Sequence, residues 1–348
     1  MVIHPTQKSK IESIDFNNLS FGTIFSDHMF VCDFAGGSWG DPEIIPYEPI
    51  QLHPSASALH YGQAIFEGLK AYKDDHGDVW LFRPDQNIKR LNKSATRLAI
   101  PQFPEDLFME GLCKLIDLDR DWVQSGVGNS LYIRPFIFAS EACVQASPAK
   151  EYRIMIICTP VSSYYDNGEV RVKIADHFSR APQGGTGYAK AAGNYAGQFY
   201  PTQLAIDEGY QQIIWTDAAT HQYIEEAGTM NLFFYIGDKL ITAPTSDSIL
   251  DGVTRKSIIE LAKNHDIEVE TRQLSVSELV EASKNNTLKE IFGSGTAVVV
   301  LPIQGFGYKG KDFKIPKLED SLAMRLKLEL TSIQYNRTED PYGWRVKV

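Results

Sequence analysis

Residues 184–197 read GGTGYAKAAGNYAG, and this stretch places one lysine, Lys190, among glycines, alanines and a threonine. Small neighbours let a planar ring approach the backbone closely, and they offer few groups that would keep an ammonium hydrated. A lysine in such surroundings can act as a neutral amine and form an imine with an aldehyde cofactor. From residue types alone, a flexible surface loop with a solvated lysine is the more frequent explanation of such a pattern.

Strand-like and helical segments alternate on both sides of this stretch. Runs rich in β-branched and aromatic residues predict strands at 28–34, 79–83, 130–138, 152–159, 169–175, 211–216, 230–236 and 297–301. Apolar residues at helical spacing predict helices at 85–98, 105–124, 195–207, 253–264, 275–284 and 319–333, with Asp85 as a cap of the first. This mixture indicates an α+β or mixed α/β fold.

The segment SSYYDNGE at residues 162–169 interrupts the alternation with Ser, Asn, Gly and two adjacent tyrosines. We therefore expect a smaller N-terminal α/β domain at 1–161, an interdomain loop at 162–172, and a larger C-terminal domain at 173–348 that carries Lys190.

Composition excludes several classes of function. The net charge of −10 argues against nucleic-acid binding, which needs a positive surface. The four cysteines form no C-x-x-C pair and no zinc pattern, which predicts no metal site and a reducing, cytoplasmic location. No apolar run of about 18 residues occurs and the first twenty residues lack a hydrophobic signal core, so we expect neither a membrane span nor secretion.

One motif can be set aside. Residues 36–40, GGSWG, match the G-x-S-x-G pattern of a hydrolase nucleophile, which requires a strand that turns into a helix. The following DPEIIPYEP contains three prolines, so no helix can begin there. The P-loop pattern G-x-x-x-x-G-K-[ST] does not occur, and the P-loop and Rossmann interpretations lack support.

Two carboxylates, Glu225 and Glu226, lead into the apolar run 230–236. In a pyridoxal-phosphate enzyme, an acid beside the pyridine nitrogen keeps the ring protonated, so that it withdraws electrons. The alternative is an exposed turn with two solvated acids.

Two glycine-containing segments could hold a phosphate. Asp251–Arg255 (DGVTR) opens a predicted helix, whose free N–H groups and dipole favour an anion, and Gly293–Ala297 (GSGTA) lets the backbone approach a ligand. Arg90 could add a fixed positive charge. Each signal is weak by itself, because helices often begin with Gly and Thr for capping alone.

Tyr132 and Arg134 are two residues apart in a predicted strand and therefore share one face of it. A hydroxyl and a guanidinium on one face can hold a substrate carboxylate. The alternative is an arginine paired with an acid at a sheet edge.

Taken in order, these segments resemble the branched-chain-amino-acid aminotransferases, which are two-domain pyridoxal-phosphate enzymes of fold type IV. The resemblance covers nearly the whole chain. Its segments are 21–30, 57–72, 131–135, 184–197, 221–236, 249–262, 290–303 and 326–344.

The resemblance implies a role for each matching residue. Lys190 would form the Schiff base with pyridoxal 5′-phosphate and act as the catalytic base, Tyr195 would lie near the ring hydroxyl, and Glu226 would pair with the pyridine nitrogen. Arg180 would support the site from behind. The phosphate would be held by Arg90, Val253, Thr254 and Thr296.

The resemblance also implies the substrate contacts. Thr229 and the turn at Ala297 would receive the α-carboxylate, while Tyr132 and Arg134 would catch the γ-carboxylate of glutamate. Tyr61, Phe66 and Tyr164 would form an apolar wall. Some relatives carry a redox C-x-x-C after G-S-G-T-A, but this chain reads Val298–Leu301 (VVVL) there, so thiol regulation of that type is not expected.

The implied reaction is reversible, ping-pong transfer of the amino group of L-leucine, L-isoleucine or L-valine to 2-oxoglutarate, giving a 2-oxo acid and L-glutamate. The resemblance also implies a homodimer or a higher homo-oligomer. Three alternatives remain open at this stage: a D-amino acid aminotransferase, an aminodeoxychorismate lyase, and a non-enzymatic binding protein that kept the fold.

Overall fold

The computed structural model describes residues 1–162 and 169–348, which form two compact units. Unit 1 comprises the described residues from Met1 to position 162 together with Ala189–Ala192 and Ser332–Val348, and unit 2 comprises the described part of 169–188 together with Gly193–Thr331. This division differs from the expected boundaries, because the Lys190 segment and the C-terminal tail belong to unit 1. Strand β10 (Arg171–Ile174) also begins inside the expected interdomain loop.

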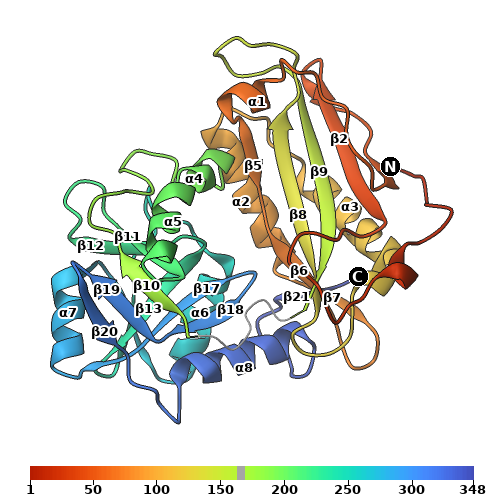
Figure 1. Cartoon of the computed structure of the whole chain (residues 1–348). Helices are drawn as coiled ribbons and strands as arrows, with labels where there is room; N and C mark the ends of the chain where they lie inside the picture. Colours follow the sequence, from red (N-terminus) through yellow and green to blue (C-terminus); the bar gives the residue numbers. More distant parts are fainter. Residues whose placement is uncertain (163–168) are drawn as a thin grey trace. The chain divides into compact units, whose positions relative to one another are not determined.

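Unit 1 is built on a mostly antiparallel sheet, visible in Figure 1 with α2 and α3 beside it. The strand order is β1 (Val2–Ile3), β4 (Glu43–Pro46), β2 (His28–Ala35), β9 (Tyr152–Val161), β8 (Ser130–Ala139), β6 (Leu69–Lys73), β7 (Val79–Phe82) and β21 (Arg345–Lys347), with β3 (Ser38–Trp39) on β2 and β5 (Ala64–Phe66) on β8. The helices are α1 (Ser57–Tyr61), α2 (Pro84–Arg97) and α3 (Glu105–Leu118), with 3-10 turns η1 (Ile11–Ser13) and η2 (Arg120–Trp122).

Alternation along β8 assigns its side chains to two faces. Leu131, Ile133 and Ile137 pack into the main core of unit 1 together with apolar residues of α2 and α3. Tyr132 and Arg134 therefore lie on the opposite face, because successive strand residues point to opposite sides. One face of the sheet thus packs into the core, and the other face carries the polar candidates Tyr132 and Arg134.

The C-terminal tail is fastened to unit 1 by a buried carboxylate. Asp74 accepts hydrogen bonds from Trp80 Nε1 and Asn336 Nδ2, both at 2.8 Å, and from the backbone N–H groups of His76 and Asp78. Burial acts to raise the pKa of Asp74, but these hydrogen bonds outweigh it and lower the pKa to about 2. The tail continues into β21, which pairs with β7.

Replacing Asp74 with Asn should lower the free energy of unfolding at pH 7 by about 2 kcal/mol. The folded pKa is below the unfolded value, so the contribution of the carboxylate is complete above about pH 4 and is lost as the pH falls through the folded pKa. Urea unfolding at a series of pH values would measure it. Asp75→Asn is the matched control, since Asp75 forms only an exposed ion pair with Arg337. Equal effects of the two variants would contradict the assignment.

Unit 2 contains a mixed sheet in the described residues. Its order is β15 (Glu268–Thr271), β14 (Lys239–Thr242), β13 (Met230–Ile236), β12 (Tyr223–Ala227), β11 (Gln212–Thr216), β10, β19 (Gly305–Tyr308) and β20 (Lys311–Lys314), with β16 (Leu274–Ser275) on β12, β17 (Leu288–Gly295) on β13, and β18 (Val299–Ile303) on β17. The remaining helices are α4 (Ala192–Ala196), α5 (Phe199–Asp207), α6 (Val253–Asn264), α7 (Val276–Lys284) and α8 (Leu322–Gln334), of which α4 and α8 each include residues of both units.

Most predicted elements are found, with three instructive differences. The helix predicted at 105–124 ends at Leu118, because the buried Asp119 carboxylate binds the backbone N–H and the ring of His28. The helix predicted at 195–207 is two helices, α4 and α5. Asp85 does not cap α2, which begins at Pro84 without a side-chain cap.

Candidate active site

Lys190 is held through its backbone within unit 1. Its N–H donates to Ser94 Oγ at 2.9 Å, and its carbonyl accepts from the N–H of Phe66 at 3.0 Å. Its ammonium nitrogen lies 4.8 Å from the centre of the Phe66 ring. The β-bridge between Ile65 and Ala191 extends this pairing. These hydrogen bonds fix the backbone of Lys190. The direction of its side chain therefore depends on the Phe66 ring and on the nearby charges.

Arg90 extends from α2 to a carboxylate that the sequence analysis did not single out. Its Nε and Nη2 donate to the two oxygens of Glu67, at 2.7 and 2.9 Å. The side chains are 9% and 0% exposed. Burial acts to raise the pKa of Glu67, but the charge and hydrogen bonds of Arg90, the charge of Lys190 and a bond from Asn87 outweigh it and lower the pKa. The pair is therefore ionised.

Tyr132, Arg134 and Phe66 form a second group in unit 1. The Arg134 guanidinium lies 4.7 Å from the centre of the Phe66 ring and donates to Tyr132 Oη at 3.3 Å. A side chain at Gly68 would place its Cβ 2.0 Å from Tyr132 Oη, so only glycine leaves room for this tyrosine. Arg134 Nε is buried without a hydrogen-bond partner among the described residues, as expected of a donor kept for a ligand.

The other two predicted members of the apolar wall are placed differently. Tyr61 lies at the end of α1, is 51% exposed, and donates from its hydroxyl to the carbonyl of Val144 at 2.7 Å. Its environment is the surface around Val144 rather than the cluster around Arg134. Tyr164 lies outside the described residues.

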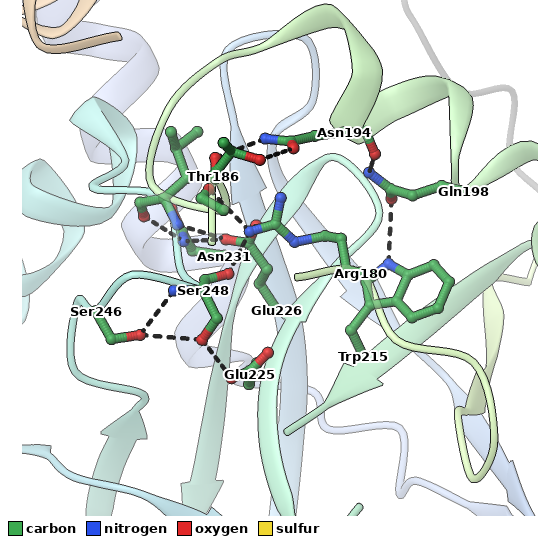
Figure 2. Close-up of polar contacts among 12 residues, drawn as sticks. Arg180, Thr186, Asn194, Gln198, Trp215, Glu225, Glu226, Asn231, Ser246 and Ser248 are labelled. Carbon is green, nitrogen blue, oxygen red and sulfur yellow. Dashed lines mark hydrogen bonds and ion pairs between the residues drawn. The ribbon is translucent and has the colours of Figure 1, made fainter. Parts of the chain in front are cut away.

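In unit 2, Glu226 is the centre of a buried polar network (Figure 2). Its Oε1 pairs with Arg180 Nη2 at 2.7 Å, and the two side chains are 6% and 3% exposed. Its Oε2 accepts from Asn231 Nδ2 at 3.1 Å and from the N–H of Leu250 at 3.0 Å. A carboxylate with these donors is fixed in place and ionised, which suits a partner for a protonated ring nitrogen.

The segment 246–250 links this network to the lysine stretch. Arg180 Nη2 donates to the carbonyls of Gly187, at 2.9 Å, and of Ser248. A Cβ at Gly187 would lie 2.5 Å from Ser248 Cα, so the two backbones can approach only because residue 187 is glycine. Figure 2 also shows Thr186 and Asn194 bonded in both directions, at 2.7 Å each, four residues to either side of Lys190 in the sequence.

Glu225, the neighbour of Glu226, has a different environment. It accepts from the hydroxyl of Ser248, and its Oε2 is buried without a hydrogen-bond partner among the described residues. Burial raises the pKa of Glu225, against the lowering effects of Ser248 and of the Arg180 charge. The two adjacent acids are thus distinguished by their surroundings, since Glu226 is ion-paired with Arg180 and Glu225 is bonded to Ser248.

The predicted phosphate and carboxylate ligands of unit 2 lie at turns and at a helix start. Val253 and Thr254 begin α6, where Gly252 provides no side-chain cap, so the first N–H groups are available to an anion. Thr296 and Ala297 lie in the turn between β17 and β18, Thr229 lies in the turn between β12 and β13, and Tyr195 lies on α4. Ser294, beside the first of these turns, has a buried hydroxyl without a partner among the described residues.

Each unit, taken by itself, carries groups that suit pyridoxal phosphate. Unit 1 supplies an amine at Lys190 and a guanidinium at Arg90. Unit 2 supplies a buried carboxylate at Glu226 and the uncapped start of α6. Unpartnered donors at Arg134 and Ser294 are the features that a ligand would satisfy.

Sequence reasoning missed several polar residues that the structure adds to these groups. Glu67 and Asn231 each interrupt an apolar strand run, and a buried polar side chain in such a run must have a partner. That rule could have identified both. Thr159 pairs across the sheet with Tyr132, and its hydroxyl has no partner in the described part of the chain; no signal in the sequence pointed to it.

Two features are absent from the described residues. No group of three or more His, Cys, Asp or Glu residues is arranged to hold a metal ion. None of the helices there combines the length and the apolar character that crossing a membrane requires.

Comparison with known proteins identifies the family. The family model for amino-transferase class IV matches residues 64–306. Branched-chain-amino-acid aminotransferase 2 of Bacillus subtilis is 44% identical over 338 residues, covering 96% of this chain and 93% of the relative. A probable branched-chain-amino-acid aminotransferase of Staphylococcus aureus (strain MRSA252) is 46% identical over 343 residues, covering 97% and 95%.

Solved structures agree. The branched-chain amino acid aminotransferase of Escherichia coli superimposes with a TM-score of 0.73 at 27% identity, covering 92% of this chain and 98% of that one. The enzyme of T.th., complexed with N-(5′-phosphopyridoxyl)-L-glutamate, gives 0.71 at 25% identity, covering 90% and 97%. The mixed α/β fold of type IV is therefore confirmed, and the chain belongs to the amino-transferase class IV family, among its branched-chain-amino-acid aminotransferases.

Proposed function

We propose that this protein is a pyridoxal-phosphate-dependent transaminase that transfers the amino group of L-leucine, L-isoleucine or L-valine to 2-oxoglutarate. The relatives described above favour this activity over that of a D-amino acid aminotransferase, an aminodeoxychorismate lyase or a binding protein. The T.th. enzyme has been captured with a phosphopyridoxyl-glutamate and, in another structure, with 4-methylvaleric acid. Those two ligands represent the two substrate types that the reaction requires.

One observation carries the proposal. The amine of Lys190 and the guanidinium of Arg134 lie 4.8 and 4.7 Å from the centre of the same Phe66 ring. A reactive amine and a carboxylate receptor therefore share one aromatic ring within unit 1. An amino acid needs both of these groups, together with an apolar surface for its side chain.

When bound, pyridoxal phosphate supplies an aldehyde that condenses with amines and a ring that withdraws electrons. Lys190 would hold the cofactor through its amine, and that amine, once free, would take the proton from the substrate Cα as a base and deliver it to the cofactor as an acid. Glu226, which is ion-paired with Arg180, would keep the pyridine nitrogen protonated. The amino group would thus arrive on the donor amino acid, which leaves as a 2-oxo acid, and depart on the acceptor in a ping-pong cycle.

The chain's own residues can distinguish the two substrates. Phe66 offers an apolar face to an aliphatic side chain, while Arg134 and Tyr132 can bind the γ-carboxylate of glutamate. Lys190, Arg90, Tyr195, Val253, Thr254 and Thr296 remain the proposed cofactor ligands, with Arg180 supporting Glu226. Tyr132, Arg134, Phe66, Thr229 and Ala297, with Tyr61 and Tyr164, remain the proposed substrate ligands.

Arg134→Ala should reduce kcat/KM for glutamate by about 10–100-fold, because a charged hydrogen bond is worth about 1.5–3 kcal/mol. The effect on leucine should be several-fold smaller, since leucine has no γ-carboxylate. Steady-state kinetics on both amino acids measure the difference. Arg153→Ala is the control, because Arg153 pairs with the exposed Asp33. An equal loss for leucine and glutamate would refute the assignment.

The proposed function is tested by the absorbance of the purified protein with pyridoxal phosphate, recorded before and after L-leucine and then 2-oxoglutarate are added. A long-wave band that is lost with leucine and returns with 2-oxoglutarate would establish both halves of the reaction. A band that ignores L-leucine and responds to D-alanine would transfer the activity to D-amino acids. The absence of any band would refute the cofactor assignment.

A homodimer is also proposed. Leu59, Tyr61 and Val144 are 62%, 51% and 58% exposed, and such a group of exposed apolar side chains is typical of an interface. Sedimentation velocity would measure the mass in solution, and a monomer at micromolar concentration would refute the proposal.

We also propose that the protein is cytoplasmic. All four cysteines are free thiols, and Cys32 and Cys158 are buried. Free thiols are typical of a reducing compartment.

A further inference from the structure

Glu67 is a buried carboxylate that is surrounded by hydrogen-bond donors, one of which is the charged guanidinium of Arg90. It is fully buried, at the end of β5, and the turn between β5 and β6 gives it the N–H of Gly68 at 3.1 Å. Asn87 Nδ2 adds a bond at 2.8 Å, and Arg90 contacts both carboxylate oxygens. A buried carboxylate held by this many donors is fixed in one orientation and remains ionised.

Glu67 is also connected to Lys190 through neighbouring residues. Its neighbour Phe66 donates from the backbone to the carbonyl of Lys190, and the Lys190 amine lies over the Phe66 ring. Ser94 completes a second connection, because its hydroxyl donates to the Arg90 carbonyl at 2.9 Å and accepts from the Lys190 N–H. Glu67 and Arg90 are therefore fixed to the same backbone segments that fix Lys190.

We propose that Glu67 is a positioning residue of this site, which orients the Arg90 guanidinium and keeps a negative charge beside the Lys190 amine. Two Arg90 donors are committed to Glu67, so the direction of the guanidinium plane is set before any phosphate arrives. Without the carboxylate, the Arg90 charge would be unbalanced in a buried region and would repel a protonated amine. The inference rests on the proposed function and extends it to a residue outside the proposed cofactor and substrate ligands.

The first test is Glu67→Gln, which keeps the size of the side chain and removes its charge. The protein with pyridoxal phosphate should show two changes. The pH midpoint of its long-wave absorbance change should fall by about one unit, because a negative charge has been removed from beside a cation. The dissociation constant for pyridoxal phosphate, measured by fluorescence titration of the apoprotein, should rise about tenfold or more, because Arg90 loses its fixed orientation.

Two further variants separate charge from structure. Glu67→Asp keeps the charge on a shorter side chain, so it should keep the pH midpoint while weakening cofactor binding. Asn87→Ala removes a neutral donor from the same carboxylate and should change the thermal unfolding midpoint without moving the pH midpoint. If Glu67→Gln does not fold, Arg90→Gln removes the positive charge of the same ion pair instead. This variant should raise the pH midpoint of the absorbance change.

A Glu67→Gln protein with an unchanged pH midpoint and unchanged cofactor affinity, differing only in thermal stability, would overturn the proposal. So would a Glu67→Asp protein whose midpoint moves as far as that of Glu67→Gln, or an Arg90→Gln protein whose midpoint does not move. Failure of the proposed function is distinguishable from these outcomes, because the unaltered protein would then show either no long-wave band or a band that does not respond to L-leucine.

Discussion

Replacing Lys190 with Ala should abolish the long-wave absorbance of the protein with pyridoxal phosphate and reduce turnover of L-leucine by about 10³-fold or more. The variant loses both the amine that holds the cofactor and the base that moves the substrate proton. Its fold should survive, because the contacts of residue 190 to Ser94 and Phe66 are made by the backbone N–H and carbonyl. Spectra, single-turnover assays and thermal unfolding measure the three properties separately.

Lys173→Ala is the matched control for this prediction. Lys173 lies on β10 and pairs with Glu208 at 2.5 Å on the surface of unit 2. Its removal should leave both the spectrum and the turnover within about twofold of the unaltered protein, since a surface ion pair contributes little. Retention of the band or of substantial turnover in Lys190→Ala would show that another amine holds the cofactor.

The second large effect is expected at Glu226. Glu226→Gln leaves the buried Arg180 without its ion-pair partner, which should lower the free energy of unfolding by about 3 kcal/mol or more. Turnover should also fall, by about 10²-fold, because a neutral amide cannot keep the pyridine nitrogen protonated and a fixed electrostatic interaction of this kind has about that effect. Denaturant unfolding and steady-state kinetics would be measured on the same preparation.

Glu225→Gln is the informative control, since the two acids are adjacent in sequence. Glu225 accepts from the hydroxyl of Ser248, whereas Glu226 is the acid ion-paired with Arg180, so turnover of Glu225→Gln should change by only a few-fold. If the two variants were equally impaired, the assignment of the ring partner to Glu226 would be wrong.

The long elements of the fold could be predicted from sequence because their local signals agree with their burial. The run MNLFFYI became β13 with the same bounds, and α6 begins and ends where the periodicity predicted. The failures have long-range causes. Helix α3 ends early because Asp119 binds His28, 91 residues away in the sequence. The expected boundaries took no account of pairings made by distant segments, such as β21 with β7.

In the candidate site, too, local sequence patterns point to some residues, while contacts between distant segments decide others. Lys190 and Glu226 lie in local sequence patterns that made both of them candidates, and their roles stay predictions. The partner of Arg90 could not be, because Glu67 lies 23 residues earlier, on another element. Similarly, the contact of Gly187 with the backbone of Ser248 is decided by a close approach between distant segments, which no local pattern encodes.

The pairing of β21 with β7 has a consequence for how this protein is made. Residues 345–347 form the last strand of a sheet whose other strands are all translated by residue 161. The emerging chain must therefore expose the edge of β7 while the whole of unit 2 is synthesised. The tail can pair with that edge and place Asn336 on Asp74 only after residues 336–347 have been synthesised. A truncation that removes residues 345–347 should thus leave a chain with an open sheet edge, a substrate for chaperones and proteases rather than a slightly shortened enzyme.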